Sequence, residues 1–577
     1  MRRGHKLFMS SRVFLVLAIA STWLPLSAAS QKHSPDLNTA SGNVPVVIRY
    51  NQTPPNAHIQ KILAAQGTVQ WNLAHVNTVA ATIPVSALST LESDPAVIYV
   101  ASDRAVNPTL DYTTAAVNAN VAFQSGFTGT GIGIAIVDSG VNHHPDLKDA
   151  SGNSRIVYSQ SFVAGDTLAI DEYGHGTLVA GIAAGDGATS TGSQYTHTFR
   201  GLAPAAHIVN LKALNASGVG TDSSVIAAID QAIALKTTYN IRVLNLSLGR
   251  PVFESYTLDP LCQAVEAAWK AGIVVVVAAG NDGRNNTYGN QGYGTINSPG
   301  NDPYVITVGA MKAEGLSSVA QDTIASYSSK GPTLFDHVVK PDLVAPGNRV
   351  ISDMTIASYL STTYPANQVA RSYYDSNPSK LLATLGIGNS LAYFQMSGTS
   401  MATPVVSGTA ALMIANSSSL TPDQIKARMM KTANKSFPVS SVAVDPATGI
   451  SYTSQYDIFT IGAGYLNVWA ALNNTDLANG LALSPPVSYN ATTGATTLTL
   501  NSAYGSTIIW GTTGLFSSTI IWGTNVFLNG STIIWGTTII WGTNTAEAFN
   551  AIWGNTIIWG TSTTTSNSES IAITGEQ

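Results

Sequence analysis

The sequence predicts an α/β fold with a doubly wound parallel sheet over residues 110–475. Two observations support this prediction. Apolar runs alternate with helical patterns, and the runs are continuous in Val and Ile instead of alternating with polar residues. Continuous runs indicate parallel strands that are covered on both faces. The predicted strands are GIGIAIVD, HIVNLKAL, IRVLNLSLG, GIVVVVAAGN and YVITVGA, with helices at 223–235 and 261–271 between them.

The first 29 residues have the pattern of a secretory signal peptide. Arg2, Arg3 and Lys6 precede an uncharged run, VFLVLAIASTWLPL, and the small residues Ser27-Ala28-Ala29 follow it. A basic start, a short apolar run and a small-residue cleavage site are typical of such signals. The run is shorter than the ~20 residues needed to span a bilayer. We therefore expect a secreted, extracellular protein, or one associated with the cell surface; an uncleaved membrane anchor is the alternative.

Residues 44–104 are predicted to form a separate unit. VPVVIRY, TVQWNLAHVNTVAATIP and AVIYVASD indicate four strands, and PNAHIQKILAAQG and VSALSTLESDP indicate two helices. The order β-α-β-β-α-β is typical of a ferredoxin-like α+β sandwich. This topology alone does not identify a function, because many unrelated functions share it.

Residues 476–577 are predicted to form a β-rich tail of short repeats. Thr-Ile-Ile-Trp-Gly-Thr or a close variant recurs from Thr507 to Thr561, and six of the ten Trp residues fall within these repeats. β-Branched and aromatic residues with glycine at a fixed phase indicate short strands and turns. One interpretation is a module for surface, polymer or glycan attachment, with Trp as the stacking platform. The other, which we favour, is a β-array in which Trp and Ile pack on each other or on the preceding domain.

Composition excludes several classes of function. Charged residues make up only 10% of the chain, and 27 basic against 32 acidic residues give a net charge of −5. Without a basic block, nucleic acid is not an expected partner. Cys262 is the single cysteine, so neither an intramolecular disulfide nor a cysteine-based metal site can form.

Four polar residues stand where the α/β pattern places a site. Asp138 ends the strand GIGIAIVD, and His175 lies between two glycines in GHGTLVAG. Asn281 ends GIVVVVAAGN, and Ser400 begins a helix in SGTSMATP. Each residue taken singly has a simpler structural explanation, such as a helix cap or a turn. Gly129, Gly131 and Gly133 precede their strand instead of following it, so a dinucleotide site is rejected.

Taken together, the windows DSGVNHHPDL, GHGTLVAG, AAGN and SGTSMATP closely resemble the active-site windows of the subtilisin-like serine proteases. Their order, Asp then His then Ser, matches that family. The resemblance implies that Ser400 is the nucleophile, His175 the general base and Asp138 the carboxylate that orients the imidazole. It implies that Asn281 and the Ser400 N–H form the oxyanion hole. No cofactor is then required for catalysis.

Substrate contacts also follow from this resemblance. Ser247-Leu248-Gly249 resembles the edge strand that pairs with the peptide backbone, which favours broad specificity. Ala278-Ala279-Gly280 resembles one wall of the specificity pocket, with 296–300 opposite. These linings imply an apolar preference, whereas Asp282 and Asp302 leave a basic preference open as the alternative.

The sequence departs from the family pattern at three places. The calcium loop is not recognisable after the His175 helix, although Asp146 matches one calcium ligand, so the metal stays unknown and a structural calcium ion stays open. Leu178 replaces a usual histidine. Residues 351–393 form a long insertion that we interpret as a lid over the cleft. His175 and Asn281 differ from the Glu and Asp of the related sedolisins, so neutral-to-alkaline activity is expected.

The resemblance implies a secreted serine endopeptidase made as a zymogen and acting on polypeptides. Residues 44–104 resemble the family's propeptide, an intramolecular inhibitor that assists folding, with processing at roughly 101–115. Two alternatives remain: a maturation protease of narrow specificity, and a catalytically inactive surface adhesin on the same fold.

Overall fold

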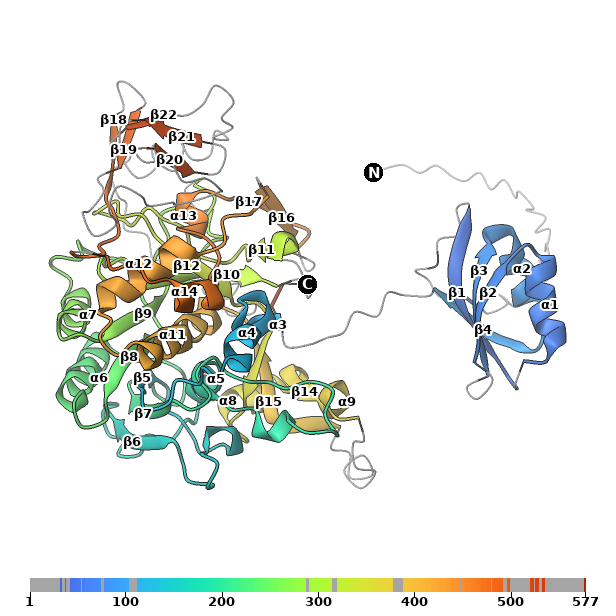
Figure 1. Ribbon diagram of the computed structural model, residues 1–577, viewed down its shortest axis with the longest axis horizontal. Coiled ribbons are helices and arrows are strands. Elements are labelled where there is room, and N and C mark those ends of the chain that lie inside the picture. The colour runs from blue at the N-terminus through green and yellow to red at the C-terminus, as the bar shows by residue number, and fades with distance from the viewer. Residues whose placement is uncertain are drawn as a thin grey trace, which may run out of the picture. The chain divides into compact units, whose positions relative to one another are not determined.

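The computed structural model describes two compact units, 1–107 and 108–577, which are treated separately (Figure 1). The described residues are 32–33, 37, 42–102 without 53 and 74–76, 112–490 without 287–289, 314–318, 377–387, 439, 446–447 and 479, then 495–498, 519–522, 525–528, 532–534 and 575–576. The predicted signal peptide and most of the predicted processing segment lie outside them. Within these ranges, no helix is both long and apolar enough to cross a membrane.

The N-terminal unit is a four-stranded antiparallel sheet with two helices. Its sheet order is β2-β3-β1-β4, and Val46, Ile48, Val79 and Val100 form a fully buried core. This is the predicted element order and a ferredoxin-like topology. The elements are β1 Asn43–Tyr50, α1 Asn56–Ala64, β2 Thr68–Leu73, β3 Thr78–Pro84, α2 Leu88–Glu92 and β4 Val97–Ser102.

The second unit is built on an eight-stranded sheet in the order β11-β10-β9-β8-β5-β7-β6, with β12 paired to β10. All pairings are parallel except that of β10 with β11. The strands are β5 Gly133–Asp138, β6 Ile156–Ser161, β7 His207–Lys212, β8 Ile241–Leu246, β9 Val274–Ala278, β10 Ile306–Lys312, β11 Thr323–Ile324 and β12 Leu343–Pro346.

The five predicted strands are β5, β7, β8, β9 and β10. Sequence analysis missed β6, β11 and β12 for physical reasons. β11 has only two residues, too few to give a recognisable pattern. β6 lies at the sheet edge with alternate residues exposed, so it lacks a continuous apolar run. β12 has only four residues and ends at Pro346, where a strand is not expected.

Helices pack on this sheet and position the polar residues at strand ends. The buried helix α11 packs against α5 and the central strands, whereas α6 packs against α7. Thr221 and Ser224 form a capping box at the start of α6, and Asp259 caps α7. The helices are α3 Tyr112–Ala116, α4 Ala119–Gln124, α5 His175–Ala184, α6 Asp222–Leu235, α7 Pro260–Lys270, α11 Thr399–Asn416, α12 Pro422–Thr432, α13 Ile458–Ile461 and α14 Val468–Asn473.

The predicted insertion at 351–393 contains a small antiparallel sheet, in the order β13-β15-β14, that flanks the loop before α5. The N–H groups of Tyr359 and Leu360 donate to the carbonyls of Glu172 and Tyr173, and the Tyr173 and Tyr359 rings stack at 5.6 Å. Its function as a lid stays a prediction. The elements are β13 Val350–Asp353, α8 Tyr359–Thr363, β14 Gln368–Ala370, α9 Arg371–Tyr374 and β15 Asn389–Met396.

Short antiparallel strands follow towards the C-terminus. β16 Ser440–Val444 pairs with β17 Ser451–Gln455, and β18 Val487–Asn490 pairs with β19 Ala495–Leu498. β21 Asn525–Leu528 lies between β20 Thr519–Trp522 and β22 Thr532–Ile534. β20 and β22 fall on two of the repeats; most of the other predicted repeats lie outside the described residues.

Candidate active site

Asp138 and His175 are in direct contact at the carboxyl end of β5. Asp138 is the last residue of that strand and is fully buried. Its Oδ1 accepts a hydrogen bond from the Ser139 N–H at 2.7 Å and lies 2.7 Å from Nδ1 of His175. With a carboxylate at Nδ1, the imidazole carries its proton there and presents Nε2 as a base.

His175 is held in place because it begins α5. Asp171 caps this helix: its Oδ1 accepts from the Gly174 N–H at 2.7 Å and its Oδ2 from the Thr177 N–H at 2.8 Å. Burial by itself lowers the pKa of His175, but the negative charges of Asp138 and Asp171 outweigh it and raise that pKa above its usual range. The imidazolium is therefore stabilised in this site.

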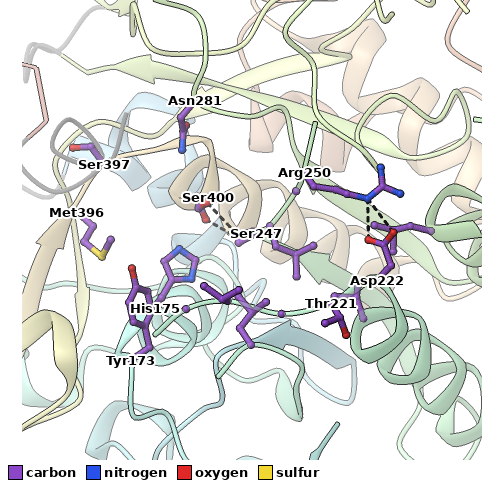
Figure 2. Close-up of a pocket in the computed structure, with 18 residues that line it drawn as sticks. Tyr173, His175, Thr221, Asp222, Ser247, Arg250, Asn281, Met396, Ser397 and Ser400 are labelled. Atoms are coloured by element: carbon purple, nitrogen blue, oxygen red, sulfur yellow. Dashed lines mark hydrogen bonds and ion pairs between the residues drawn. The ribbon is translucent and has the colours of Figure 1, made fainter. Parts of the chain in front are cut away.

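Ser400 lies at the start of α11, beside a backbone turn that only glycine readily adopts. Gly398 has φ +142°, and the helix begins at Thr399. In the described rotamer, the Ser400 hydroxyl donates to the Ser247 carbonyl at 3.0 Å. Figure 2 shows this hydroxyl in the same pocket as the His175 ring. Catalytic hydrogen bonds are often not yet formed in ligand-free sites, and here a rotation of the serine side chain would be needed to reach the imidazole.

Asn281 follows β9 and faces Ser400. Its Oδ1 accepts from the Thr399 N–H at 2.9 Å and the Thr399 hydroxyl at 3.1 Å. These two bonds fix the amide so that its nitrogen is directed towards Ser400 (Figure 2). A fixed N–H₂ group beside a helix N-terminus can stabilise negative charge that develops on a substrate oxygen.

The pocket that contains these residues has a volume of about 420 Å³. Sequence analysis missed part of its lining, because which residues line the pocket depends on which loops meet in the folded chain. Arg250, directly after the predicted segment 247–249, bonds to Asp222 at 2.9 Å and to Asp259 at 2.8 Å. The lining comprises Tyr173, His175, Leu214, Gly218, Val219, Gly220, Thr221, Asp222, Val225, Ser247, Leu248, Gly249, Arg250, Leu261, Asn281, Met396, Ser397 and Ser400.

The remaining predicted substrate residues lie elsewhere. Ala278, Ala279 and Gly280 are not in the lining of this pocket, and the two alanines are buried. Neither Asp282 nor Asp302 lines it. Asp302 is fully buried, and this burial raises its pKa to about 7. In this arrangement neither carboxylate presents a charge to the pocket.

The surroundings of Asp146 do not fit a calcium ion. Its Oδ1 accepts from the Thr189 N–H and hydroxyl, both at 2.8 Å, and its Oδ2 accepts from the Tyr393 hydroxyl at 2.6 Å. The neighbouring groups are His144, whose ligand atom is nitrogen, and Asp353. Calcium requires six to eight oxygen ligands, whereas both Asp146 oxygens already accept hydrogen bonds and the two neighbouring groups add only one nitrogen and one further carboxylate.

Comparison with known proteins identifies the family. The family model described as the subtilase family matches residues 129–450. The chain belongs to the subtilase family. It is 36% identical over 372 residues to serine protease AprX of Bacillus subtilis, covering 62% of this chain and 75% of that protein. It is 29% identical over 433 residues to subtilisin E of the same species, covering 74% and 94%. It is 31% identical over 382 residues to an alkaline protease of Shouchella clausii, covering 64% and 79%.

Membership confirms two predictions from the sequence. The protein is a serine-type endopeptidase that acts on polypeptides, and residues 129–450 belong to a doubly wound α/β domain of the subtilase type. The inactive-adhesin alternative loses support, because His175, Ser400 and Asn281 line one pocket and Asp138 contacts His175.

Proposed function

We propose that this subtilase is a secreted endopeptidase, made as a zymogen, that cleaves peptide bonds through Asp138, His175 and Ser400. The observation that carries the proposal is the 2.7 Å contact between Asp138 and His175, next to a pocket lined by His175, Ser400 and Asn281. A serine hydroxyl is a poor nucleophile without such a base.

In the proposed mechanism, the Ser400 hydroxyl first turns from the Ser247 carbonyl to His175 Nε2. As Oγ bonds to the substrate carbonyl carbon, its proton passes to Nε2, and Asp138 stabilises the imidazolium. The carbonyl oxygen becomes an oxyanion that accepts from Asn281 Nδ2 and the Ser400 N–H. The proton then passes to the leaving amine as the C–N bond breaks. Water, deprotonated by His175, hydrolyses the acyl-enzyme and regenerates the serine.

Broad specificity with an apolar preference is the proposed substrate profile. Ser247, Leu248 and Gly249 line the pocket, as does the exposed Val219. Pairing with the substrate main chain tolerates many sequences. Arg250 contributes no free charge, because Asp222 and Asp259 both pair with it. A profile of cleaved peptides distinguishes this enzyme from a narrow maturation protease: cleavage at one sequence only would favour the latter.

The two flanking regions complete the proposal. The N-terminal unit would act as the propeptide, an intramolecular inhibitor removed at roughly 101–115. The repeats after residue 475 would serve either as packing or as a surface-attachment module. Truncation near residue 480 separates these two: unchanged activity with lost polymer binding supports the attachment module.

Casein hydrolysis by the wild type and by Ser400→Ala tests the central proposal, with N-terminal sequencing of the secreted product. We expect Ser400→Ala to lose activity and to remain unprocessed. Ser419→Ala, an exposed serine beyond the same helix, is the matched control and should behave as the wild type. Comparable casein hydrolysis by Ser400→Ala would refute the assignment of the nucleophile.

A further inference from the structure

Glu576, next to the last residue of the chain, is buried on the second unit with only 7% of its surface exposed. Its carboxylate Oε1 accepts from Nη2 of Arg284 at 2.8 Å, from the Ser326 N–H at 2.9 Å and from the Ser326 hydroxyl. A buried carboxylate with a guanidinium and two further donors has the geometry of specific charge recognition.

The backbone of the same residue is also recognised. Asn348 Oδ1 accepts from the Glu576 N–H at 2.8 Å, and Asn348 Nδ2 donates to the Glu576 carbonyl at 3.0 Å. One side-chain amide thus pairs with both polar groups of the peptide backbone, which fixes the position and direction of the segment.

The preceding residue is a glycine at a position where a side chain would require the site to shift. Gly575 has φ +73°, and a Cβ placed on it would lie 2.5 Å from Ser397 Oγ and 2.6 Å from Arg349 Cγ. Any larger residue would clash and would also be strained at this φ. The geometry of the site therefore fits glycine followed by glutamate.

We propose that Arg284, Ser326, Asn348 and Ser397 form a recognition site for a Gly-Glu peptide. In this chain the site is filled in cis by Gly575-Glu576. These contacts attach residues 575–576 of the C-terminal extension to the catalytic domain. Arg284 is also held by groups outside the Gly-Glu segment, because it pairs with Asp445 at 3.1 Å and donates to Ser326 Oγ at 2.6 Å.

The recognition site adjoins the candidate active site. Ser397 lines the catalytic pocket on the side of Asn281 (Figure 2). Arg284 lies three residues after Asn281 in the same loop. Asn348 follows Gly347, whose carbonyl accepts the N–H of Gly398 at 2.8 Å, two residues before Ser400. The Gly-Glu segment thus contacts residues of the two loops that carry Asn281 and Ser400.

Peptide binding in trans tests the proposal on full-length chains. All chains carry Ser400→Ala to prevent self-digestion, and the probe is the labelled peptide Ile-Thr-Gly-Glu-Gln, which copies residues 573–577. In the double variant Gly575→Ala/Glu576→Gln, the chain's own segment no longer competes for the site. We therefore expect the peptide to bind this variant at least about tenfold more tightly than it binds the chain with the native Gly575-Glu576. Probe peptides with Gln for Glu, or Ala for Gly, should bind at least about tenfold more weakly.

Hydrogen exchange provides an independent measurement on the intact chain. Glu576→Gln should speed exchange of the Ser326 amide by about tenfold or more, because that N–H loses a charged acceptor. Glu569→Gln, the same change seven residues earlier, is the control. Equal binding of all three peptides, or exchange at Ser326 that is the same in both variants, would overturn the proposal.

Discussion

At the residue scale, the candidate site depends on two carboxylates instead of one. The Ser139 hydroxyl donates to Asp171 Oδ1 at 2.8 Å and lies 3.3 Å from Asp138 Oδ1. Asp171 also caps the helix that begins at His175. The same buried residue thus positions the imidazole through the backbone and adds negative charge near it. Asp171 was not predicted from the sequence, because its role depends on contacts with β5 and α5.

Replacing Asn281 by alanine should lower kcat by ~10²–10³ with a small change in KM. The reason is that its amide stabilises charge present only in the transition state. Steady-state kinetics on a peptide substrate measure this. Asn473→Ala, an exposed asparagine outside the pocket lining, is the control. A rise in KM with kcat unchanged would assign Asn281 to ground-state binding instead.

The pH dependence of kcat/KM should reflect His175. General-base catalysis requires the neutral imidazole, and the charges of Asp138 and Asp171 raise its pKa despite burial. Activity should therefore fall as pH drops through a value above the usual ~6.5, which gives a neutral-to-alkaline optimum. Asp171→Asn should move this acid limb to lower pH. A sharp optimum near pH 4 would contradict the assignment.

At the scale of elements, the sequence predicted what depends on local pattern. The five apolar strands and the positions of Asp138, His175, Asn281 and Ser400 at element ends were accessible, because buried strands and glycine-flanked windows are local signals. Arg250, Asp222 and Thr221 were not accessible as pocket residues, because the β8 and α6 loops meet only in the folded sheet. The edge strand β6 was missed because none of its residues is fully buried, so it lacks a continuous apolar run.

The approach of α5 to β5 depends on Gly176. A Cβ there would lie 2.1 Å from the Gly140 carbonyl oxygen and 3.1 Å from Asp138 Cβ. Gly176→Ala should therefore separate His175 from Asp138, with a loss of about 1–3 kcal/mol in stability from overpacking and a strong loss of kcat. Thermal unfolding and kinetics measure the two effects. Gly388→Ala, where a Cβ meets nothing within 4 Å, is the control. A fully active Gly176→Ala enzyme would contradict this.

At the scale of the whole molecule, the two units differ in how they can fold. The N-terminal unit is an antiparallel sheet with a core of its own, in which β1 pairs with β3 and β4. In the second unit β5, at 133–138, must pair with β7 at 207–212 and with β8 at 241–246. Parallel pairings between distant segments close long loops before they gain contacts, so this domain should fold slowly.

A chain without residues 30–109 should therefore yield less active enzyme than the complete chain, although its native contacts within the second unit are unchanged. Slow folding leaves apolar strands exposed to aggregation. A folded N-terminal unit that binds the partly folded second unit would lower the free-energy barrier to folding of that unit. Refolding yield, measured as active sites titrated per mole of chain, checks this. Residues 30–109 added in trans should restore the yield during refolding and inhibit enzyme that is already folded. If the shortened chain refolds with full yield, the N-terminal unit does not assist folding; if the added unit leaves folded enzyme uninhibited, it is not the inhibitor either.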